Sequence, residues 1–436
     1  MKERLINMTK YTVKKVNTPL KGTVVVPGSK SMTNRALLLA ALSEEESYLK
    51  GVLFSDDSRH FLDCLVKLGY DLEVNEKEKT VRMQGHGRKI PNTRGTIDVG
   101  SAGTAARFIT AFLALSDGEY EIQCSAQMEK RPMAELFHVL TKMGAKFTYL
   151  KQEGFLPVRV KGNGGHCEDI QMDISKSTQF LSAMLMVTPI TESGIRISIT
   201  SEKKEGSYIT ITKKMLEGFG VQVEFDGRDY LVPGKQKIHV GEYYIEPDVS
   251  AACYFYGMAA LTGGQVIVEN VHKTSMQGDM KFLEVLSQMG CQVADTEEGI
   301  CVTGAAKGKL KGVDINMNDF SDQALTLAAL APFAEGDTYI RNIGHIRGQE
   351  CNRMAAIVNE LNKCGIFCEE IGDDIHIVPG EVQPATISTY DDHRVAMAFT
   401  LLGLRSDGIE ISDPLCCRKT FEDYFTVLDS FLEENR

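Results

Sequence analysis

Apolar and polar residues alternate along this chain in a pattern that recurs five times. Each copy predicts an amphipathic helix that ends in Leu-x-x-x-Gly, followed by a strand of alternating apolar and polar residues. Glycine is favoured at that point because many helices end in a left-handed residue. The five copies are 70 to 76 residues apart, a near-constant spacing that indicates an internal repeat. Their glycines are Gly69, Gly144, Gly220, Gly290 and Gly365.

A second pattern recurs with the same period. A short strand runs into a turn rich in Ser, Asp and Gly, and a helix of small apolar residues follows. Because these helices are apolar on nearly every side, we expect them to be buried. The six copies span residues 23–42, 96–115, 170–187, 243–261, 313–333 and 385–404.

Six repeats predict an α/β protein of two similar lobes, three repeats each, with a cleft between them. The last repeat lacks a strand pair after its final helix, and the N-terminal segment 11–16 (YTVKKV) can supply what is missing. The chain is then expected to cross between lobes near Gly28 and Asp248. One lobe would comprise residues 1–28 and 248–436, and the other residues 29–247.

Composition narrows the class of protein. The 436 residues suffice for two or three domains, and 43% hydrophobic with 25% charged residues is typical of a globular protein. No apolar run reaches the roughly 18 residues of a membrane span, and the N-terminus lacks a signal-peptide pattern. We therefore expect a cytoplasmic protein without a membrane partner. The 11 scattered cysteines form no CxxC pair, so buried thiols are expected rather than a metal site.

The net charge of −11 argues against nucleic acid as a partner, but a local basic cleft can still bind a small anion. The predicted helix starts offer such a place, because free N–H groups and the helix dipole attract anions there. Ordinary surface charge is the alternative. A P-loop is excluded, because the spacing around Gly28 and Lys30 does not fit that motif. The residues at or near the helix starts are Lys30, Ser31, Arg35, Gly103, Thr104, Arg107, Ser177, Thr178, Gln179, Asp322, Asp392, His393 and Arg394, with Arg131, Arg347, Glu350, Arg353 and Lys419 in connecting segments.

Several motifs, in order along nearly the whole chain, resemble the 3-phosphoshikimate 1-carboxyvinyltransferase family of enolpyruvyl transferases. They are PGSKSMTNRALLLAAL, GSAGTAARF, RPM, SKSTQFL, SDQALTLA, YDDHRVAMAF and RKTFEDYF. The resemblance implies two lobes, each of three βαβαββ-type repeats with helices inside and sheets outside, an inside-out α/β barrel. It also implies transfer of the enolpyruvyl group of phosphoenolpyruvate to the 5-hydroxyl of shikimate 3-phosphate, by addition and elimination through a tetrahedral intermediate. Phosphate would be released, and neither cofactor nor metal would be needed. Separately, we expect the protein to be a monomer.

The resemblance also implies roles for particular residues. Asp322, Glu350 and Lys30 match catalytic positions, the two carboxylates serving in proton transfer. The positions matching shikimate 3-phosphate binders are Lys30, Ser31, Arg35, Ser177, Thr178, Gln179, Tyr208, Asp322, His345 and Gln349. The positions matching phosphoenolpyruvate binders are Lys30, Gly103, Arg131, Gln179, Arg353, Arg394 and Lys419.

These residue types suit the implied chemistry. A carboxylate can remove a proton from an alcohol and return one to a methylene carbon. Arg binds carboxylate and phosphate through a planar fork, and Lys acts as a point charge. Plainer alternatives stay open: Asp322 as a helix-start residue, Glu350 as a structural partner of Arg353, and Tyr208 as an ordinary strand residue.

Three positions depart from the family pattern, namely Ser101, Glu205 and Gln349. They leave open a paralogue that acts on another cyclitol acceptor. UDP-N-acetylglucosamine as the acceptor is disfavoured, because the loop cysteine of those enzymes is replaced by Ala126. A non-catalytic protein that binds phospho-metabolites is the third alternative.

Overall fold

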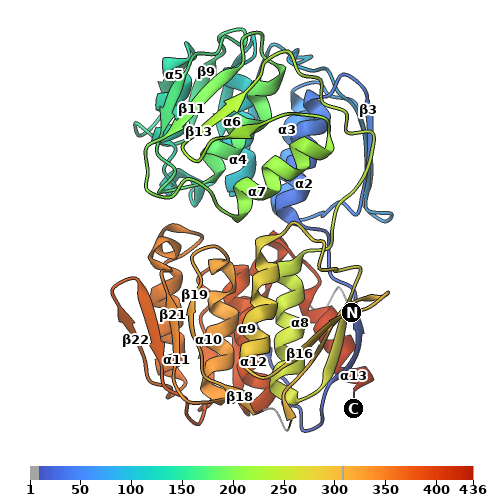
Figure 1. Cartoon of the computed structure of the whole chain (residues 1–436), viewed down its shortest axis with the longest axis vertical. Helices are drawn as coiled ribbons and strands as arrows, with labels where there is room; N and C mark the ends of the chain where they lie inside the picture. The colour runs from blue at the N-terminus through green and yellow to red at the C-terminus, as the bar shows by residue number, and fades with distance from the viewer. Residues whose placement is uncertain (1–8, 307–308, 436) are drawn as a thin grey trace. The chain divides into compact units, whose positions relative to one another are not determined.

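The computed structural model describes residues 9–306 and 309–435 (Figure 1). Its contacts divide the chain into two compact units, the boundaries falling between Pro27 and Gly28 and between Glu246 and Pro247. We call Gly28–Glu246 the central unit. The rest of the chain, N-terminal and C-terminal segments together, is the terminal unit. Of the lobe expected to begin at residue 1, residues 1–8 lie outside the described part.

In the central unit, three four-stranded sheets surround three buried helices, α2, α4 and α6. Alternating small and apolar residues leave these helices without a polar face, which explains their burial. The second helix of each repeat is apolar on one side only and lies on the outside. Its elements are α2 (Lys30–Leu42), β3 (Glu46–Lys50), α3 (Asp56–Lys67), β4 (Leu72–Asn75), β5 (Thr80–Gln84), β6 (Arg94–Asp98), α4 (Gly103–Ala114), β7 (Glu119–Gln123), the 3-10 helix η1 (Met128–Lys130), α5 (Ala134–Lys142), β8 (Lys146–Tyr149), β9 (Val158–Lys161), β10 (Ile170–Met172), α6 (Gln179–Val187), η2 (Thr188–Ile190), β11 (Ile195–Ile199), α7 (Ser207–Gly218), β12 (Glu224–Phe225), β13 (Asp229–Val232) and β14 (Glu242–Tyr244).

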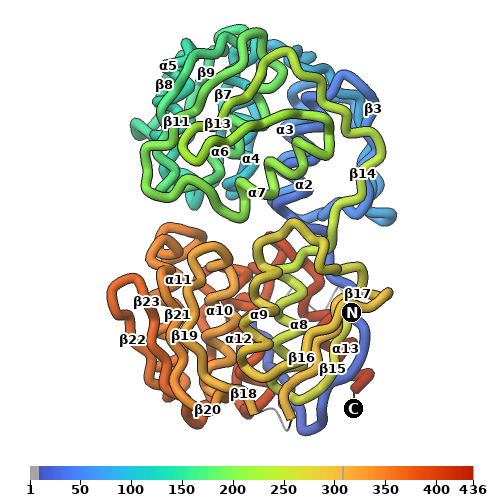
Figure 2. The backbone as a smooth tube through the Cα atoms, in the orientation of Figure 1, coloured from blue at the N-terminus to red at the C-terminus, as the bar shows by residue number. Residues whose placement is uncertain are grey.

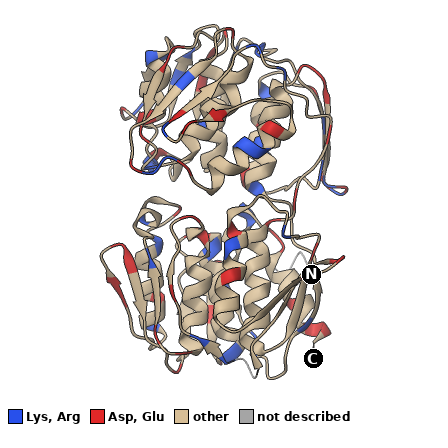
Figure 3. Cartoon of the chain, in the orientation of Figure 1, with Lys and Arg blue, Asp and Glu red and all other residues tan. Residues whose placement is uncertain are grey.

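The terminal unit is built in the same way around α8, α10 and α12. Charged residues on these helices are confined to first and last turns (Figure 3). Its elements are β1 (Lys10–Thr12), β2 (Lys21–Val24), α8 (Val249–Thr262), β15 (Gln265–Glu269), η3 (Gly278–Lys281), α9 (Phe282–Gln288), β16 (Gln292–Asp295), β17 (Gly299–Thr303), β18 (Leu310–Lys311), β19 (Asp314–Asn316), η5 (Ser321–Gln323), α10 (Ala324–Leu330), η6 (Ala331–Phe333), β20 (Ala334–Glu335), β21 (Thr338–Arg341), η7 (Gly344–Gly348), α11 (Arg353–Lys363), β22 (Cys368–Ile371), β23 (Asp374–Ile377), β24 (Ala385–Ile387), α12 (His393–Arg405), β25 (Ile409–Ser412), η8 (Pro414–Lys419) and α13 (Tyr424–Glu434).

The predicted βαβαββ repeat is confirmed. Three sheets share one strand order, β6-β7-β9-β8, β10-β11-β13-β12 and β19-β21-β23-β22. In each, the first two strands are parallel and joined across a core helix, and the last two pair antiparallel.

Two repeats exchange their first strands. β14 precedes α8 in sequence but pairs with β3 of the central unit, whereas β2 precedes α2 but pairs with β15 of the terminal unit. β1 completes the last sheet by pairing antiparallel with β25, so the N-terminal segment lies among C-terminal elements (Figure 2). The sequence patterns did not predict this exchange, nor the small sheet of β18 and β20.

Glycine is required at two repeated places. The five predicted helix-ending glycines all have positive φ, between 78° and 105°, as expected for a left-handed helix end. A second set directly follows the last strand of a repeat and packs on the carbonyl end of a core helix. A Cβ on Gly85 would lie 2.2 Å from the Ser43 carbonyl oxygen, and one on Gly162 would lie 2.0 Å from that of Ser116.

All 11 cysteines are free thiols, nine buried and two half-buried, as expected. Among the residues described, no helix combines the length and the apolar character needed to cross a membrane.

Candidate active site

In the central unit, Lys30 and Ser31 open helix α2, and both side chains are half-buried. The Lys30 ammonium lies 3.4 Å from the Asp57 carboxylate, which is 2% exposed and belongs to the first turn of α3. Asp57 thus restrains a predicted site residue and was missed by sequence reasoning. The sequence offered only one sign of Asp57, namely acidic residues at the start of the helix. Acidic residues are common in the first turn of helices, so this sign is not specific.

Arg35 is fully buried, one turn further along α2. Its guanidinium donates to Thr212 Oγ1 (2.8 Å), to the Tyr208 carbonyl (3.1 Å) and to Ser182 Oγ (3.3 Å). Burial lowers the Arg35 pKa to about 10. Arg35 therefore links α2 to α6 and α7, and its predicted contact with a ligand stays a prediction.

Two arginines flank Gly103 at the start of α4. A Cβ there would lie 2.5 Å from Arg131 Nη1 and 2.8 Å from Arg107 Nη1. The Nε atom of Arg131 is buried and has no hydrogen-bond partner within the described residues. Only glycine leaves room for both guanidinium groups beside this helix end.

The turn Ser177–Thr178–Gln179 leads into α6, with all three residues half-buried. Ser177 Oγ accepts from the Gln179 backbone N–H at 3.3 Å, and Gln179 Oε1 accepts from Arg107 at 2.6 Å. Tyr208 lies in the first turn of α7, so its interpretation as a strand residue was wrong. Helix propensity is weak in the segment YITIT, which is rich in β-branched residues, and tertiary packing decides its structure.

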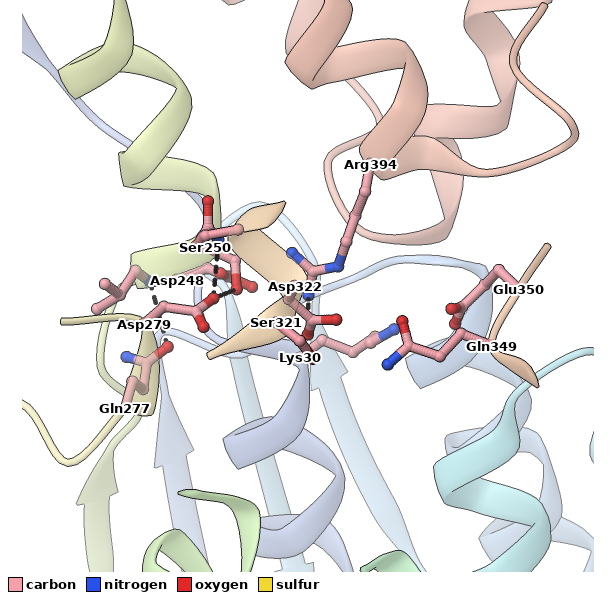
Figure 4. Close-up of polar contacts among 12 residues, drawn as sticks. Lys30, Asp248, Ser250, Gln277, Asp279, Ser321, Asp322, Gln349, Glu350 and Arg394 are labelled. Atoms are coloured by element: carbon pink, nitrogen blue, oxygen red, sulfur yellow. Dashed lines mark hydrogen bonds and ion pairs between the residues drawn. The ribbon is translucent and has the colours of Figure 1, made fainter. Parts of the chain in front are cut away.

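In the terminal unit, Asp322 forms ion pairs with two arginines, Arg353 and Arg394. Figure 4 shows Asp322 beside Arg394. Its Oδ1 is 2.8 Å from Arg353 Nη1, and its Oδ2 is 2.9 Å from Arg394 Nη2. Asp322 belongs to η5, the short turn that precedes core helix α10, and is about 13% exposed. Both carboxylate oxygens are thus held in a fixed orientation.

Arg353 is the centre of this cluster. It is 1% exposed, and its guanidinium also reaches Glu350 Oε2 at 2.9 Å and Asp392 Oδ2 at 2.7 Å. It donates a short hydrogen bond to Gln349 Oε1 as well. Burial alone would lower the pKa of Arg353, but the carboxylates, led by Asp392, raise it above its ordinary value.

Asp392 has a second role as the N-cap of α12, where it accepts from the Arg394 backbone N–H at 2.9 Å. Tyr390 and Asp391, directly before it, both adopt left-handed φ values near 55°. Non-glycine residues rarely adopt this conformation, and such strain concentrates at functional sites.

Lys419 and His345 complete the predicted set in this unit. Lys419 is 7% exposed, and its ammonium makes no hydrogen bond within the described residues, although Glu350 Oε1 lies 3.9 Å away. His345 lies on η7 with Nε2 at 2.8 Å from Ser321 Oγ.

The predicted site residues therefore form two sets. Those from Lys30 to Tyr208 belong to the central unit, and those from Asp322 to Lys419 belong to the terminal unit. Each set combines cations with hydroxyl, amide or carboxylate groups near the starts of buried helices. Among the described residues, no group of three or more His, Cys, Asp or Glu side chains could hold a metal ion.

Cations at the starts of buried helices, with carboxylates held beside them, are typical of sites that bind small anionic molecules and transfer protons. The sequence model of EPSP synthase (3-phosphoshikimate 1-carboxyvinyltransferase) matches residues 14–428. The chain belongs to the EPSP synthase family.

Individual relatives agree with this assignment. The 3-phosphoshikimate 1-carboxyvinyltransferase of Nostoc punctiforme is 42% identical over 420 residues, which cover 96% of this chain and 98% of that protein. That of Vibrio cholerae is 40% identical over 422 residues, which cover 96% and 97%. The solved structure of EPSP synthase from Acinetobacter baumannii superposes with a TM-score of 0.81 at 26% identity, covering 97% of this chain and 98% of that one.

Proposed function

We propose that this chain carries out the reaction of its family: the enolpyruvyl group of phosphoenolpyruvate passes to the 5-hydroxyl of shikimate 3-phosphate, and phosphate is released. The observation that carries the proposal at residue level is the Arg353 cluster. One buried guanidinium contacts both predicted proton-transfer carboxylates, Asp322 and Glu350. A further cation lies beside each carboxylate, Arg394 at Asp322 and Lys419 at Glu350.

The acceptor is assigned mainly to the central unit. Ser177, Thr178 and Gln179 would bind its phosphate through hydroxyl, amide and backbone N–H groups at the start of α6. Lys30 and Ser31 would bind from the start of α2. Arg35 holds the Tyr208 backbone, so its contribution would include keeping that ring in place. Asp322, His345 and Gln349 would contact the acceptor from the terminal unit.

The donor carries a phosphate and a carboxylate, and each needs donors to replace its water. Arg131 and Lys419 are the strongest candidates, because each has a buried nitrogen without a hydrogen-bond partner among the described residues. Lys30, Gly103, Gln179, Arg353 and Arg394 complete the proposed donor site. We propose that the two sets of residues act on the same pair of substrates.

The chemistry then follows from two carboxylates. Asp322 takes the proton of the 5-hydroxyl while the hydroxyl oxygen bonds to C2 of phosphoenolpyruvate. At the same time, Glu350 gives a proton to the methylene carbon of phosphoenolpyruvate. The tetrahedral intermediate collapses when Glu350 removes a proton from the new methyl group and phosphate leaves. Lys30, Arg131 and Lys419 stabilise the charge that shifts between the oxygens.

The test is an assay of the purified protein with both substrates, following phosphate release and the vinyl protons of the product. We expect turnover with shikimate 3-phosphate and no loss of turnover after treatment with a metal chelator. Phosphate release with another cyclitol only, or binding of both substrates without release, would overturn the proposal.

The departures from the family pattern bear on the acceptor. Glu205 is exposed, and its Oε1 lies 3.7 Å from Lys213 Nζ, so its charge is partly compensated. Gln349 accepts a hydrogen bond from Arg353, which occupies its side-chain oxygen. Neither contact favours a different acceptor.

We also propose that the protein is a cytoplasmic monomer. The large exposed apolar side chains, among them Val25, Val66, Tyr244 and Phe367, are scattered one by one over different elements. Light scattering should give a mass near 48.2 kDa, and twice that mass would contradict the proposal.

A further inference from the structure

A buried carboxylate outside the predicted site lies close to Asp322. Asp279 is the second residue of the turn η3, directly before helix α9, and is 8% exposed. It accepts a short hydrogen bond from Ser250 Oγ on α8 (Figure 4). It accepts a second one, of 2.8 Å, from Gln323 Nε2. Burying a carboxylate costs free energy unless it has hydrogen-bond or ion-pair partners. The buried position of Asp279 therefore points to a specific role for this side chain.

The bond to Gln323 connects Asp279 to the candidate base. Gln323 directly follows Asp322 in η5, is fully buried, and uses its other amide atom to accept from Thr326 Oγ1 at 2.9 Å. Because both ends of the Gln323 amide are fixed, η5 has little freedom to rotate. The Asp322 side chain is thereby held at a fixed place between Arg353 and Arg394.

The segment before Asp279 is anchored as well. Gln277 accepts from the Val249 backbone N–H at 3.1 Å and donates to the Pro247 carbonyl at 2.8 Å. The turn that carries Asp279 is therefore fixed to the start of α8, which makes it a rigid support for η5.

Charges face Asp279 from each packed element. The titratable groups around Asp279 are Arg394 on α12, Asp322 on η5 and the thiol of Cys253 on α8. Asp248, the N-cap of α8, acts on the same thiol. Burial, and then repulsion from Asp322, raise the pKa of Asp279 above its ordinary value, whereas Arg394 and the hydrogen bonds from Ser250 and Gln323 favour its ionised form. The two carboxylates therefore repel one another.

We propose that Asp279 is a positioning residue for Asp322: it fixes η5 through Gln323 and sets a second negative charge beside the Asp322–Arg394 ion pair. The inference rests on the proposed role of Asp322 as base. Two arginines on one carboxylate would make it a weak base, because they favour its ionised form. A nearby negative charge offsets part of that effect and keeps the carboxylate able to take a proton from an alcohol.

The test compares Asp279→Asn with the wild-type enzyme across a pH series, with phosphoenolpyruvate and shikimate 3-phosphate as substrates. We expect kcat to fall about tenfold or more, with both KM values within about threefold. We also expect the acid limb of the pH profile to move to lower pH, because the remaining arginines then act on Asp322 unopposed. A purely structural residue would not move this limb.

Asp407→Asn is the matched control, since Asp407 is exposed in the same unit and pairs only at the surface with Lys15. It should behave as wild type. If Asp279→Asn does not fold, Gln323→Met keeps the charge but removes the link, and its kcat should still fall with the acid limb unmoved. An Asp279→Asn enzyme with wild-type kcat and pH profile, or a Gln323→Met enzyme with wild-type kcat, overturns the inference. A wild-type enzyme without turnover overturns the proposed function, and this inference with it.

Discussion

At the scale of single residues, Arg353 holds together carboxylates that would otherwise repel one another. Its guanidinium contacts Asp322, Glu350 and Asp392, of which Asp392 is completely buried. Removing one partner of a buried ion pair is costly because the other charge is left uncompensated. Arg353 thus explains how the two carboxylates proposed to transfer protons can lie near one another in their ionised forms.

Replacement of Asp322 by Asn tests the base. The amide oxygen can still accept from Arg353, so the fold and substrate binding should persist, but it cannot take a proton. We expect kcat to fall about 100-fold or more, with KM values changed by less than about threefold. Steady-state kinetics would show this, and a variant with wild-type kcat would remove Asp322 from the mechanism.

Replacement of Gly103 by Ala tests the donor site. The added methyl group would collide with the guanidinium groups of Arg131 and Arg107, which must then move. We expect the KM for phosphoenolpyruvate to rise about tenfold, equivalent to about 1.4 kcal/mol, with the KM for shikimate 3-phosphate nearly unchanged. An equal rise in both KM values would speak against a donor-specific role for this helix start.

At the scale of elements, the repeats depend on close approach between strand ends and core helices. Gly162→Ala would place a methyl group against the carbonyl oxygens that end α4, and should cost about 2 kcal/mol of unfolding free energy. Gly218→Ala is the matched control, because a Cβ there meets nothing within 4 Å in an exposed turn of α7. It should leave stability unchanged or slightly higher. Urea unfolding of both variants measures the difference, and equal stabilities would contradict the packing argument.

His376 on strand β23 is expected to contribute to the stability of the fold in a pH-dependent way. Hydrogen bonds to Asp337 and then to Glu369 raise its pKa above the ordinary value. A raised pKa in the folded state means stabilisation that is complete below the unfolded pKa, about 6.5, and is lost as pH rises through the folded pKa. The Tm deficit of His376→Gln should therefore be larger near about pH 5.5 than near about pH 9. A deficit that is independent of pH would show that the ring stacked on Tyr339, and not its charge, is what stabilises this sheet.

At the scale of the whole molecule, local patterns predicted the repeats well and their long-range details less well. The buried helices and the helix-ending glycines follow from periodicity and backbone conformation, both of which are local properties. The burial of Arg35 and the pairing of Lys30 with Asp57 depend on which elements meet in space. The same holds for Asp279, which lies 43 residues before Asp322 and is linked to it through the hydrogen bond from Gln323. The exchange of β2 and β14 also breaks the order that a strict repeat would impose.

That exchange, with the pairing of β1, has a consequence during synthesis on the ribosome. The central unit is continuous from Gly28 to Glu246 and can complete its sheets as soon as β14 emerges. The first two strands to be synthesised stay unpaired until their partners are made. β2 pairs with β15, and β1 pairs with β25. Between β1 and β25, Lys10 contacts Glu410, which is 400 residues away in sequence. Such distant contacts slow folding. Strand β1 can therefore pair only after nearly the whole chain has been synthesised.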